Sequence, residues 1–254
     1  MRNYFFFLKK ELKEGIKTYK LPILLCIFFT FGVLSPMTAK FLPKLLPSLL
    51  GEGMNFEIPE PSSTDSWTQY FKNINQLGFV VVILIFSGIL SHEFEKGTLI
   101  NLLTKGLSRT TVLLSKLTYM IVVWTVNLVL SFLITWGYTV YYFSDGKSPH
   151  LVSAIFPIWL FGCLLLSVFL FSATLFEKSS GSLLIMVLFT AAGLFLSIID
   201  RIAKFNPFSL VQKNLPFIQG TEFLSDYLPA MCISFLLIVL LTFGACKVFK
   251  KKVL

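Results

Sequence analysis

The chain has 254 residues, of which 55% are hydrophobic and only 14% are charged, and its formal net charge is +9. Because soluble domains carry about 25% charged residues, this composition excludes an ordinary soluble domain and predicts an integral membrane protein. The cysteines lie within apolar runs and form neither a CxxC pair nor a metal-ligand spacing, so we interpret them as small core residues: Cys26, Cys163, Cys232 and Cys246.

The first twenty residues, MRNYFFFLKKELKEGIKTYK, predict a basic amphipathic helix. One helical face carries apolar and aromatic residues, namely Phe5, Leu8, Leu12, Ile16 and Tyr19. The other face carries lysines, namely Lys9, Lys10, Lys13, Lys17 and Lys20. A helix of this kind lies in the membrane interface ahead of the first span, and a solvated basic tail is the alternative. No clear small-x-small cleavage site follows, so a signal peptide is not indicated.

Apolar runs predict an all-α membrane protein with six transmembrane helices, at about Leu21–Thr38, Gln76–Leu90, Val112–Phe143, Leu151–Phe176, Ser182–Ile199 and Tyr227–Phe249. The second run is short unless the helix begins earlier, between Trp67 and Asn75. The third is longer than a bilayer core of ~30 Å requires at ~1.5 Å per residue, so we expect it to tilt or to project.

The basic residues predict the orientation. With the N-terminus inside, the inner segments hold most of the 22 Lys and Arg residues. The positive-inside rule therefore predicts that both termini and residues 91–116 are cytoplasmic. Lys116 stands at the inner end of the third span, where we expect its side chain to reach the inner surface.

Two segments fall on the outer side in this topology. Residues 37–75 are rich in proline and end in an aromatic stretch that leads into the second span. Residues 200–226 mix polar and apolar residues and are broken by Pro207 and Pro216. This second segment forms either short helices that dip into the outer leaflet or a surface loop. In the fifth span, small residues predict either close helix packing or a lipid-facing surface: Ala191, Ala192 and Gly193.

Several kinds of chemistry are missing from the sequence. No predicted span has an acidic or basic residue near its middle, which argues against an ion-coupled carrier. The pair His92-Glu93 lacks the second histidine of an HExxH zinc site, and no GxxxxGK[ST] phosphate loop occurs. We therefore predict no catalytic residue, no metal site and no ATP hydrolysis by this chain.

Residues 91–116, SHEFEKGTLINLLTKGLSRTTVLLSK, form a charged island between two apolar runs. Leucines at positions i, i+3 and i+4 predict a short helix: Leu99, Leu102 and Leu103. Acidic residues stand at its start and a lysine in its last turn, where the helix dipole favours each: Glu93, Glu95 and Lys105. Gly106 suits the end of this helix and Ser108 the N-cap of the next one.

This island resembles the first cytoplasmic loop of type-2 ATP-binding-cassette exporter permeases. In that family an acidic pair precedes Lys-Gly-Thr, then come a leucine-rich turn and a Ser-Arg pair before the third span. The matching residues here are Glu93, Glu95, Lys96-Gly97-Thr98, Leu102-Leu103, Leu107-Ser108-Arg109 and Ser115-Lys116. Gly106 departs from the proline that many members have at this point.

The resemblance implies one permease domain over residues 1–254, with residues 1–20 as the interfacial helix, 91–116 as the coupling-helix loop and 200–226 as an extracellular segment. Two copies, or this chain with a related permease, would pair with separate ATPase subunits that bind ATP and Mg²⁺. The residues expected to couple to the ATPase are Glu93, Phe94, Glu95, Lys96, Gly97, Thr98, Leu99, Leu102, Leu103, Ser108 and Arg109.

The cargo is the least determined feature. The spans offer apolar walls with scattered hydroxyl groups, so we interpret Thr30, Ser87, Thr190 and Ser197 as candidates for the substrate path. The resemblance favours export of hydrophobic or amphipathic peptides, as in toxin or antimicrobial-peptide export and immunity, across a bacterial cytoplasmic membrane. Export of lipids, glycans or drugs stays open, as do a non-transporting scaffold or sensor subunit and an ion-coupled carrier. The expected partners are ABC ATPase subunits, a second or related permease, the peptide cargo and membrane lipid. No nucleic-acid partner is expected.

Overall fold

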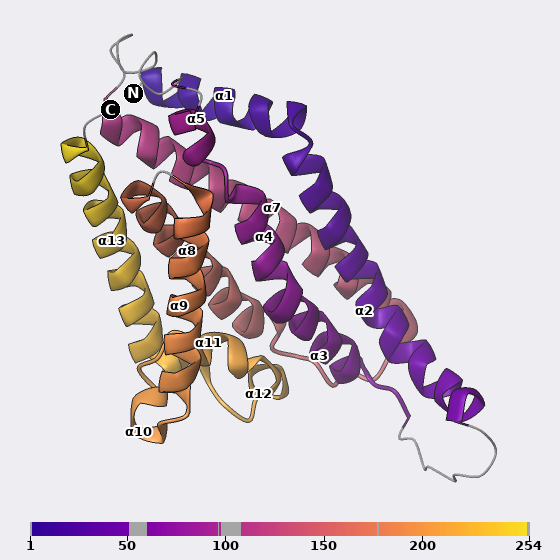
Figure 1. Cartoon of the computed structure of the whole chain (residues 1–254). Coiled ribbons are helices and arrows are strands. Elements are labelled where there is room, and N and C mark those ends of the chain that lie inside the picture. The colour runs from indigo at the N-terminus through magenta and orange to yellow at the C-terminus, as the bar shows by residue number, and fades with distance from the viewer. Residues whose placement is uncertain (1, 51–59, 96, 98–107, 177, 253–254) are drawn as a thin grey trace.

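A computed structural model describes residues 2–50, 60–95, 97, 108–176 and 178–252 (Figure 1). Within these ranges the regular structure is entirely helical, which confirms the predicted fold class. The elements in chain order are α1 (Arg2–Lys17), α2 (Lys20–Leu50), α3 (Ser63–Asn73), the π-helix η1 (Ile74–Gly78), α4 (Phe79–Phe86), α5 (Ser91–Glu95), α7 (Arg109–Tyr142), α8 (Leu151–Leu175), α9 (Ser179–Ser197), α10 (Asp200–Ala203), α11 (Ser209–Gln212), α12 (Asn214–Gln219), the 3₁₀-helix η2 (Leu224–Tyr227) and α13 (Leu228–Lys251).

The described residues contain six helical stretches that are long and apolar enough to cross a membrane, as predicted. These spans are Lys20–Pro43, Ser63–Phe94, Arg109–Tyr142, Leu151–Leu175, Ser179–Ser197 and Leu224–Lys251. The second span begins at Ser63, a little before the stretch from Trp67 to Asn75 in which the sequence allowed an earlier start. The third, α7, has 34 residues and at ~1.5 Å per residue exceeds the ~30 Å hydrocarbon core, as expected.

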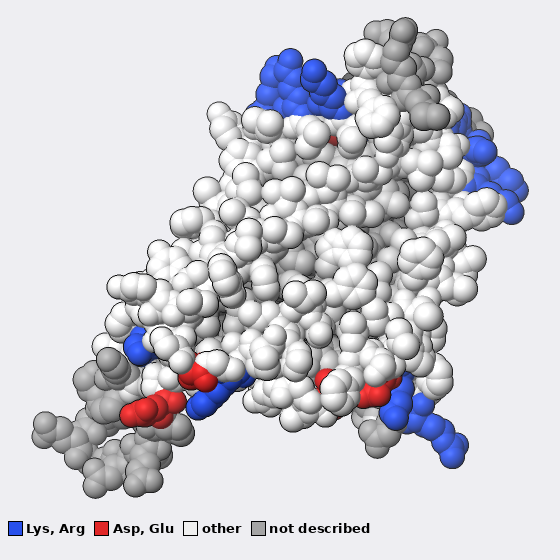
Figure 2. Space-filling view, turned by 180° about the vertical axis from the view of Figure 1, so that it is seen from behind, with Lys and Arg blue, Asp and Glu red and all other residues white. Residues whose placement is uncertain are grey.

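Both described ends of the chain lie at one end of the helix bundle, where α1 runs across the long helices (Figure 1). We call this the terminal end, and we call the opposite end, which carries α10–α12, the far end. Seen from behind, charged side chains gather at these two ends, and a broad band between them is uncharged (Figure 2). An uncharged band between two charged ends is what a bilayer requires of a spanning protein.

The centre of the bundle is formed by α7 and α8. In α8, 78% of the apolar window is buried, whereas the value for both α9 and α13 is 17%. Close approach of α7 and α8 depends on Gly162, because a Cβ there would lie 2.3 Å from the Trp124 ring. Two indole hydrogen bonds then join the helices: Trp124 donates to the Trp159 carbonyl, and Trp159 donates to the Thr125 hydroxyl.

At the far end, residues 200–227 form the short helices α10, α11, α12 and η2 rather than an irregular loop. Asn75, in the π-helix of the second span, donates to the Val211 carbonyl (2.7 Å) and to the side-chain oxygen of Asn214 (3.0 Å). Gly193 makes room for this segment, since a Cβ there would lie 2.0 Å from the Phe208 ring. The close packing expected of the small residues in α9 therefore involves the far-end segment.

The remaining small residues of α9 agree with one of the two predicted alternatives, whereas two of the cysteines depart from the prediction. Ala191 and Ala192 are exposed, in agreement with a lipid-facing surface at these positions. Cys163 is buried as expected, but Cys26 and Cys232 are exposed. The core interpretation is thus wrong for these two cysteines, because apolar runs in a membrane protein face lipid as readily as protein.

Candidate functional site

The five-residue helix α5 is placed against several other elements at the terminal end (Figure 1). The Ser91 hydroxyl lies 2.5 Å from that of Ser179 at the start of α9. The Phe94 ring packs edge-on against Phe249 of α13, with ring centroids 6.2 Å apart. The ammonium group of Lys252, just after α13, lies 4.4 Å from the centre of the Phe94 ring. A displacement of α5 would therefore act directly on the ends of α9 and α13.

Glu93, another residue of α5, belongs to a closed ring of alternating charges, which we call the charge ring. One Glu93 oxygen lies 2.9 Å from the Lys10 ammonium and 3.1 Å from the Lys116 ammonium. One oxygen of Glu11 lies 3.1 Å from Lys10 and 3.0 Å from Lys116. The ring thus joins α1, which supplies Lys10 and Glu11, to α5 and α7, and its two carboxylates and two ammonium groups balance in charge.

Three members of the charge ring are inside the protein. The exposed fraction of the side chain is 1% for Lys116, 6% for Glu11 and 8% for Glu93, against 40% for Lys10. The expectation that Lys116 reaches the inner surface is therefore wrong: α1 covers it and supplies a carboxylate. The Phe7 ring lies beside both ammonium groups, 4.9 Å from Lys10 and 5.6 Å from Lys116. Burial of this kind is costly unless every charge stays paired.

The pKa shifts of two residues on α1 agree with strong pairing between its charged side chains and their neighbours. Burial would lower the pKa of Lys10, but the neighbouring carboxylates of Glu11 and Glu93 outweigh it and raise that pKa well above its ordinary value. Burial would likewise raise the pKa of Glu14, yet its contact with Lys10 lowers that pKa overall. Glu14 lies 3.1 Å from Lys10 but is 54% exposed, and Lys116 acts on it only electrostatically, without an ion pair. Both shifts favour the charged forms of Lys10 and Glu14.

A small polar cavity of about 40 Å³ adjoins the charge ring. The second Glu93 oxygen and the Tyr119 hydroxyl, both lining it, are buried and have no hydrogen-bond partner among the described residues. A cavity of this size holds a water molecule, which can bond both groups. Tyr119 also lies against Gly15, where a Cβ would be 2.0 Å from the Tyr119 oxygen, so glycine allows α1 to lie this close to α7.

Of the residues predicted to couple to an ATPase, two at the start of α7 bind within the chain. The Ser108 hydroxyl accepts from the Thr111 amide (3.1 Å), which confirms the predicted N-cap. The Arg109 guanidinium donates to the carbonyls of Phe249 (3.0 Å), Lys250 (3.2 Å) and Lys252, and so satisfies the last turn of α13. Together with buried Glu93, these side chains bond within the chain, although Ser108 is exposed and Arg109 is only partly buried.

The rest of the predicted coupling set is only partly within the described residues. Glu95 ends α5, and Gly97 has a backbone φ of +61°, a conformation that favours glycine. Lys96, Thr98, Leu99, Leu102 and Leu103 lie outside the described residues, as do Lys105 and Gly106. The short leucine-rich helix and its contact with a partner stay predictions.

The structure does not concentrate the four hydroxyl residues proposed for a substrate path. Thr30 is on α2, Ser87 follows α4, and Thr190 and Ser197 are on α9, which has no extensive packing with α2. Three of them use the hydroxyl on their own helix: Thr30 donates to Cys26, Thr190 to Met186 and Ser197 to Leu194. The hydroxyl groups of these three residues bond carbonyls of their own helices. A role of the four residues in a substrate path stays a prediction.

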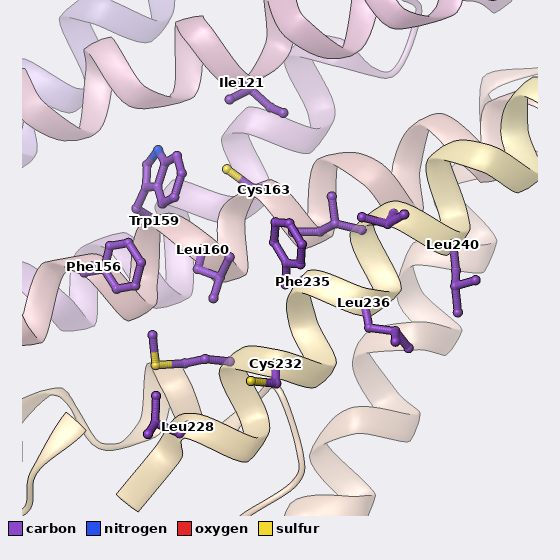
Figure 3. A pocket seen from close by; sticks show the side chains of 13 residues that line it. Ile121, Phe156, Trp159, Leu160, Cys163, Leu228, Cys232, Phe235, Leu236 and Leu240 are labelled. Carbon is purple, nitrogen blue, oxygen red and sulfur yellow. The ribbon is translucent and has the colours of Figure 1, made fainter. Parts of the chain in front are cut away.

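An apolar groove, which the sequence does not indicate, lies between α7, α8 and α13 (Figure 3). Its volume is about 820 Å³, and its lining is almost wholly apolar, with Ile121, Trp159 and Phe235 among the side chains that point into it. The lining residues come from three helices distant in sequence and carry no polar signature. Only the packing of those helices therefore reveals the groove.

The fold is that of a multi-pass helical membrane protein. At its terminal end, side chains of the short helix α5 contact several of the other helices. A family model described as "ABC-2 family transporter protein" matches residues 6–252, and the chain belongs to that family. The family is one of membrane components of ATP-binding-cassette transporters, not of their ATPases. The family that the residue 91–116 island indicated is confirmed.

A curated relative is an uncharacterized transmembrane protein, YxlG, of Bacillus subtilis (strain 168). The two are 23% identical over 164 residues, which cover 60% of this chain and 61% of the relative. The matched region thus spans about three fifths of the relative's length. This relative is also a transmembrane protein, and the similarity assigns no cargo to this chain.

Proposed function

We propose that this chain is a permease subunit of an ATP-driven exporter and that its ATPase subunits dock on the segment from Glu93 to Arg109. The observation that carries the proposal is the position of α5, whose side chains reach α1, α7, α9 and α13 at once. A force applied at this segment is passed to four helices without an intermediate. ATP and Mg²⁺ bind to the partner ATPase, and both termini face the cytoplasm with it.

Within this segment we assign two kinds of role. Glu93 and Arg109 hold the segment against the ends of neighbouring helices, and Ser108 caps the start of α7. The leucine-rich stretch, Leu99, Leu102 and Leu103, supplies the apolar anchor for the ATPase, and Lys96 and Glu95 fix its orientation. This division follows the general rule that buried apolar groups give affinity, whereas charges at the rim give register.

The transport path forms between two permease copies, or between this chain and a related permease. Support comes from the large apolar side chains that α9 and α13 leave exposed, Val187 and Phe195 on the former and Phe235 and Phe243 on the latter. A single copy also leaves the apolar groove open along one side. A second copy and lipid together would cover these surfaces.

For the cargo we propose hydrophobic or amphipathic peptides, moved out of a bacterial cell through its cytoplasmic membrane. The groove favours an apolar cargo surface, because its almost wholly apolar lining offers few hydrogen-bonding groups to a polar one. A helical peptide satisfies its own backbone and suits such a wall better than an extended one. Lipids, glycans and drugs are the competing cargoes.

The test of docking is co-purification of a Walker-motif ATPase with the tagged permease from its native membrane in mild detergent. We expect the ATPase to be retained by wild-type permease and to be lost with Glu93→Lys, which inverts a charge that holds α5. Glu222→Lys at the far end is the matched control, because Glu222 pairs with Lys213 at 3.0 Å but has no contact with α5. Loss with both variants, or with neither, contradicts docking at this segment.

The test of cargo uses the purified complex in proteoliposomes with a panel of amphipathic helical peptides. We expect at least one peptide to stimulate ATP hydrolysis and to accumulate on the side opposite the ATPase. A complex that hydrolyses ATP but responds to no peptide in the panel contradicts the peptide assignment and leaves the competing cargoes. A permease that moves solute without any ATPase is a carrier, and one that never moves cargo is a sensor or scaffold.

A further inference from the structure

We infer that Glu11, Lys10 and Lys116 are positioning residues for energy coupling: the charge ring fastens the N-terminal helix α1 to α5, so that α1 moves when the ATPase moves α5. This inference rests on the proposed function. It adds to the coupling segment a second moving part, which lies some eighty residues away in sequence (Lys10 to Glu93 is a separation of 83).

The first step concerns how many bonds hold Glu93. A single Glu93 oxygen receives both ammonium groups of the charge ring, at 2.9 and 3.1 Å, and the other oxygen has no partner among the described residues. Glu93 therefore holds α5 to α1 and to α7 through one atom. A shift of α5 has to carry the lysines with it or break both contacts together.

The second step concerns the cost of breaking them. Lys116 and Glu11 are almost completely buried, so their charges cannot be transferred to water when α5 moves. A buried charge that loses its partner is strongly unfavourable. The arrangement that keeps every charge paired is one in which α1, which supplies Lys10 and Glu11, and the start of α7, which supplies Lys116, shift together with α5.

The third step shows that α1 is placed so that it can follow. Only one stripe of the helix is buried against the bundle, with Phe7, Glu11 and Gly15 at its centre. The opposite side leaves Phe6 and Ile16 exposed. A helix held by one stripe can shift without opening the core around α8.

The end of α1 offers a place where the motion can be taken up. A two-residue turn, Thr18 and Tyr19, separates α1 from α2, and Tyr19 has a backbone φ of +59°. The helices α1 and α2 are therefore not one continuous rod, and a tilt of α1 at this turn does not require a tilt of α2.

The chain provides a matched control on α1 itself. Glu14 contacts the same lysine as the charge ring does, Lys10, at 3.1 Å, but it is more than half exposed and does not contact Glu93 or Lys116 in the structure. Glu11→Gln and Glu14→Gln are thus the same chemical change, three residues apart on one helix. Only the first of them opens the charge ring.

The experiment measures the motion of α1 in the full permease–ATPase complex reconstituted in nanodiscs. The four cysteines are replaced by alanine, and spin labels are attached at Lys13→Cys on α1 and at Lys147→Cys at the far end, both exposed positions. Pulsed EPR distances are compared without nucleotide and after trapping with ATP and vanadate. We expect the distance to change on trapping in the wild-type background and with Glu14→Gln, and to stay constant with Lys10→Gln, which removes the ammonium group that joins Glu93 to α1. Glu11→Gln and Lys116→Met, which open the charge ring but keep that contact, should reduce the change.

A second readout separates positioning from mere structural support. The rate of ATP hydrolysis by the complex, relative to the ATPase alone, should change about fivefold or more with Glu11→Gln and Lys116→Met, in the range of typical coupling between sites. This relative rate should be unchanged with Glu14→Gln. With Lys116→Arg, which keeps the charge, it should equal the wild-type rate. If Glu11→Gln does not fold, Lys10→Gln tests the same link at a partly exposed position.

Three outcomes overturn the inference. The first is a wild-type complex in which α1 does not move on trapping. The second is a Glu11→Gln complex in which α1 moves as in wild type, and the third is an identical effect of Glu11→Gln and Glu14→Gln. In each of these outcomes the ATPase is bound and active, so the proposed function stands. If no ATPase binds the wild-type permease at all, the proposed function fails first, and the inference fails with it.

Discussion

Replacing Lys116 by methionine gives the sharpest test of the charge ring as a structural element. Methionine is similar in length but uncharged, so Glu11 and Glu93 keep only Lys10 between them. Removing one partner from a buried ion pair costs about 3–5 kcal/mol. Because Lys10 is 40% exposed and remains within 3.1 Å of both carboxylates, we expect a value at the lower end, about 3 kcal/mol in the free energy of unfolding.

The assay is equilibrium unfolding of the permease in detergent micelles, followed by tryptophan fluorescence and by circular dichroism. Lys213→Met is the control: it breaks the pair with Glu222, whose side chains are 44% and 30% exposed, and should cost less than ~1 kcal/mol. Adding Glu11→Gln to Lys116→Met leaves Lys10 and Glu93 as a balanced pair and should recover at least half of the loss. A Lys116→Met permease as stable as the Lys213→Met control would refute the reasoning.

Three further predictions concern other parts of the molecule. Gly193→Ala places a Cβ 2.0 Å from the Phe208 ring and should speed proteolysis within residues 200–226, whereas Gly137→Ala, with no atom within 4 Å of the new Cβ, should not. Arg109→Gln removes charged hydrogen bonds to the last turn of α13, worth about 1.5–3 kcal/mol each, and should raise hydrogen exchange there; unchanged exchange would show that the turn is held by other contacts. The Asp145 carboxylate accepts from the first amide of α3 (2.8 Å); burial would raise its pKa, but this bonding lowers it below the ordinary 3.8. The stability that wild type has over Asp145→Asn should therefore be constant above pH 3.8 and should disappear as the pH falls through the lowered pKa; a loss that begins near neutral pH would contradict this assignment.

The spans could be predicted from sequence because each depends on a local quantity, the apolar content of a run long enough to cross a bilayer. The Ser108 N-cap could be predicted for the same reason, since a cap bonds to an amide three residues on. The start of the second span was harder. Its first turns carry Trp67 and Tyr70, which are fully buried but amphipathic, so hydropathy alone places the helix start too late.

The charge ring could not be predicted, because each of its members has a simpler local explanation. Glu11 stands among lysines and is expected to be solvated, and Lys116 stands near a membrane edge and is expected to snorkel. Their contact spans 105 residues of sequence and depends on how α1 lies across the bundle. Helical periodicity shows that α1 is amphipathic, but it does not say that Phe7 and Glu11 face protein while Phe5 and Ile16 do not.

The distribution of burial indicates which helices can move under the proposed function. The helix α8 is buried over most of its length, and shifting it would disturb the packing of Trp124 against Gly162. By contrast, α1, α9 and α13 each have an exposed face and each touch α5 or the charge ring through a side chain. Motion that enters at α5 therefore shifts the outer helices against a fixed α8. The apolar groove lies along that boundary, between α8 and α13, so a shift of α13 changes its width.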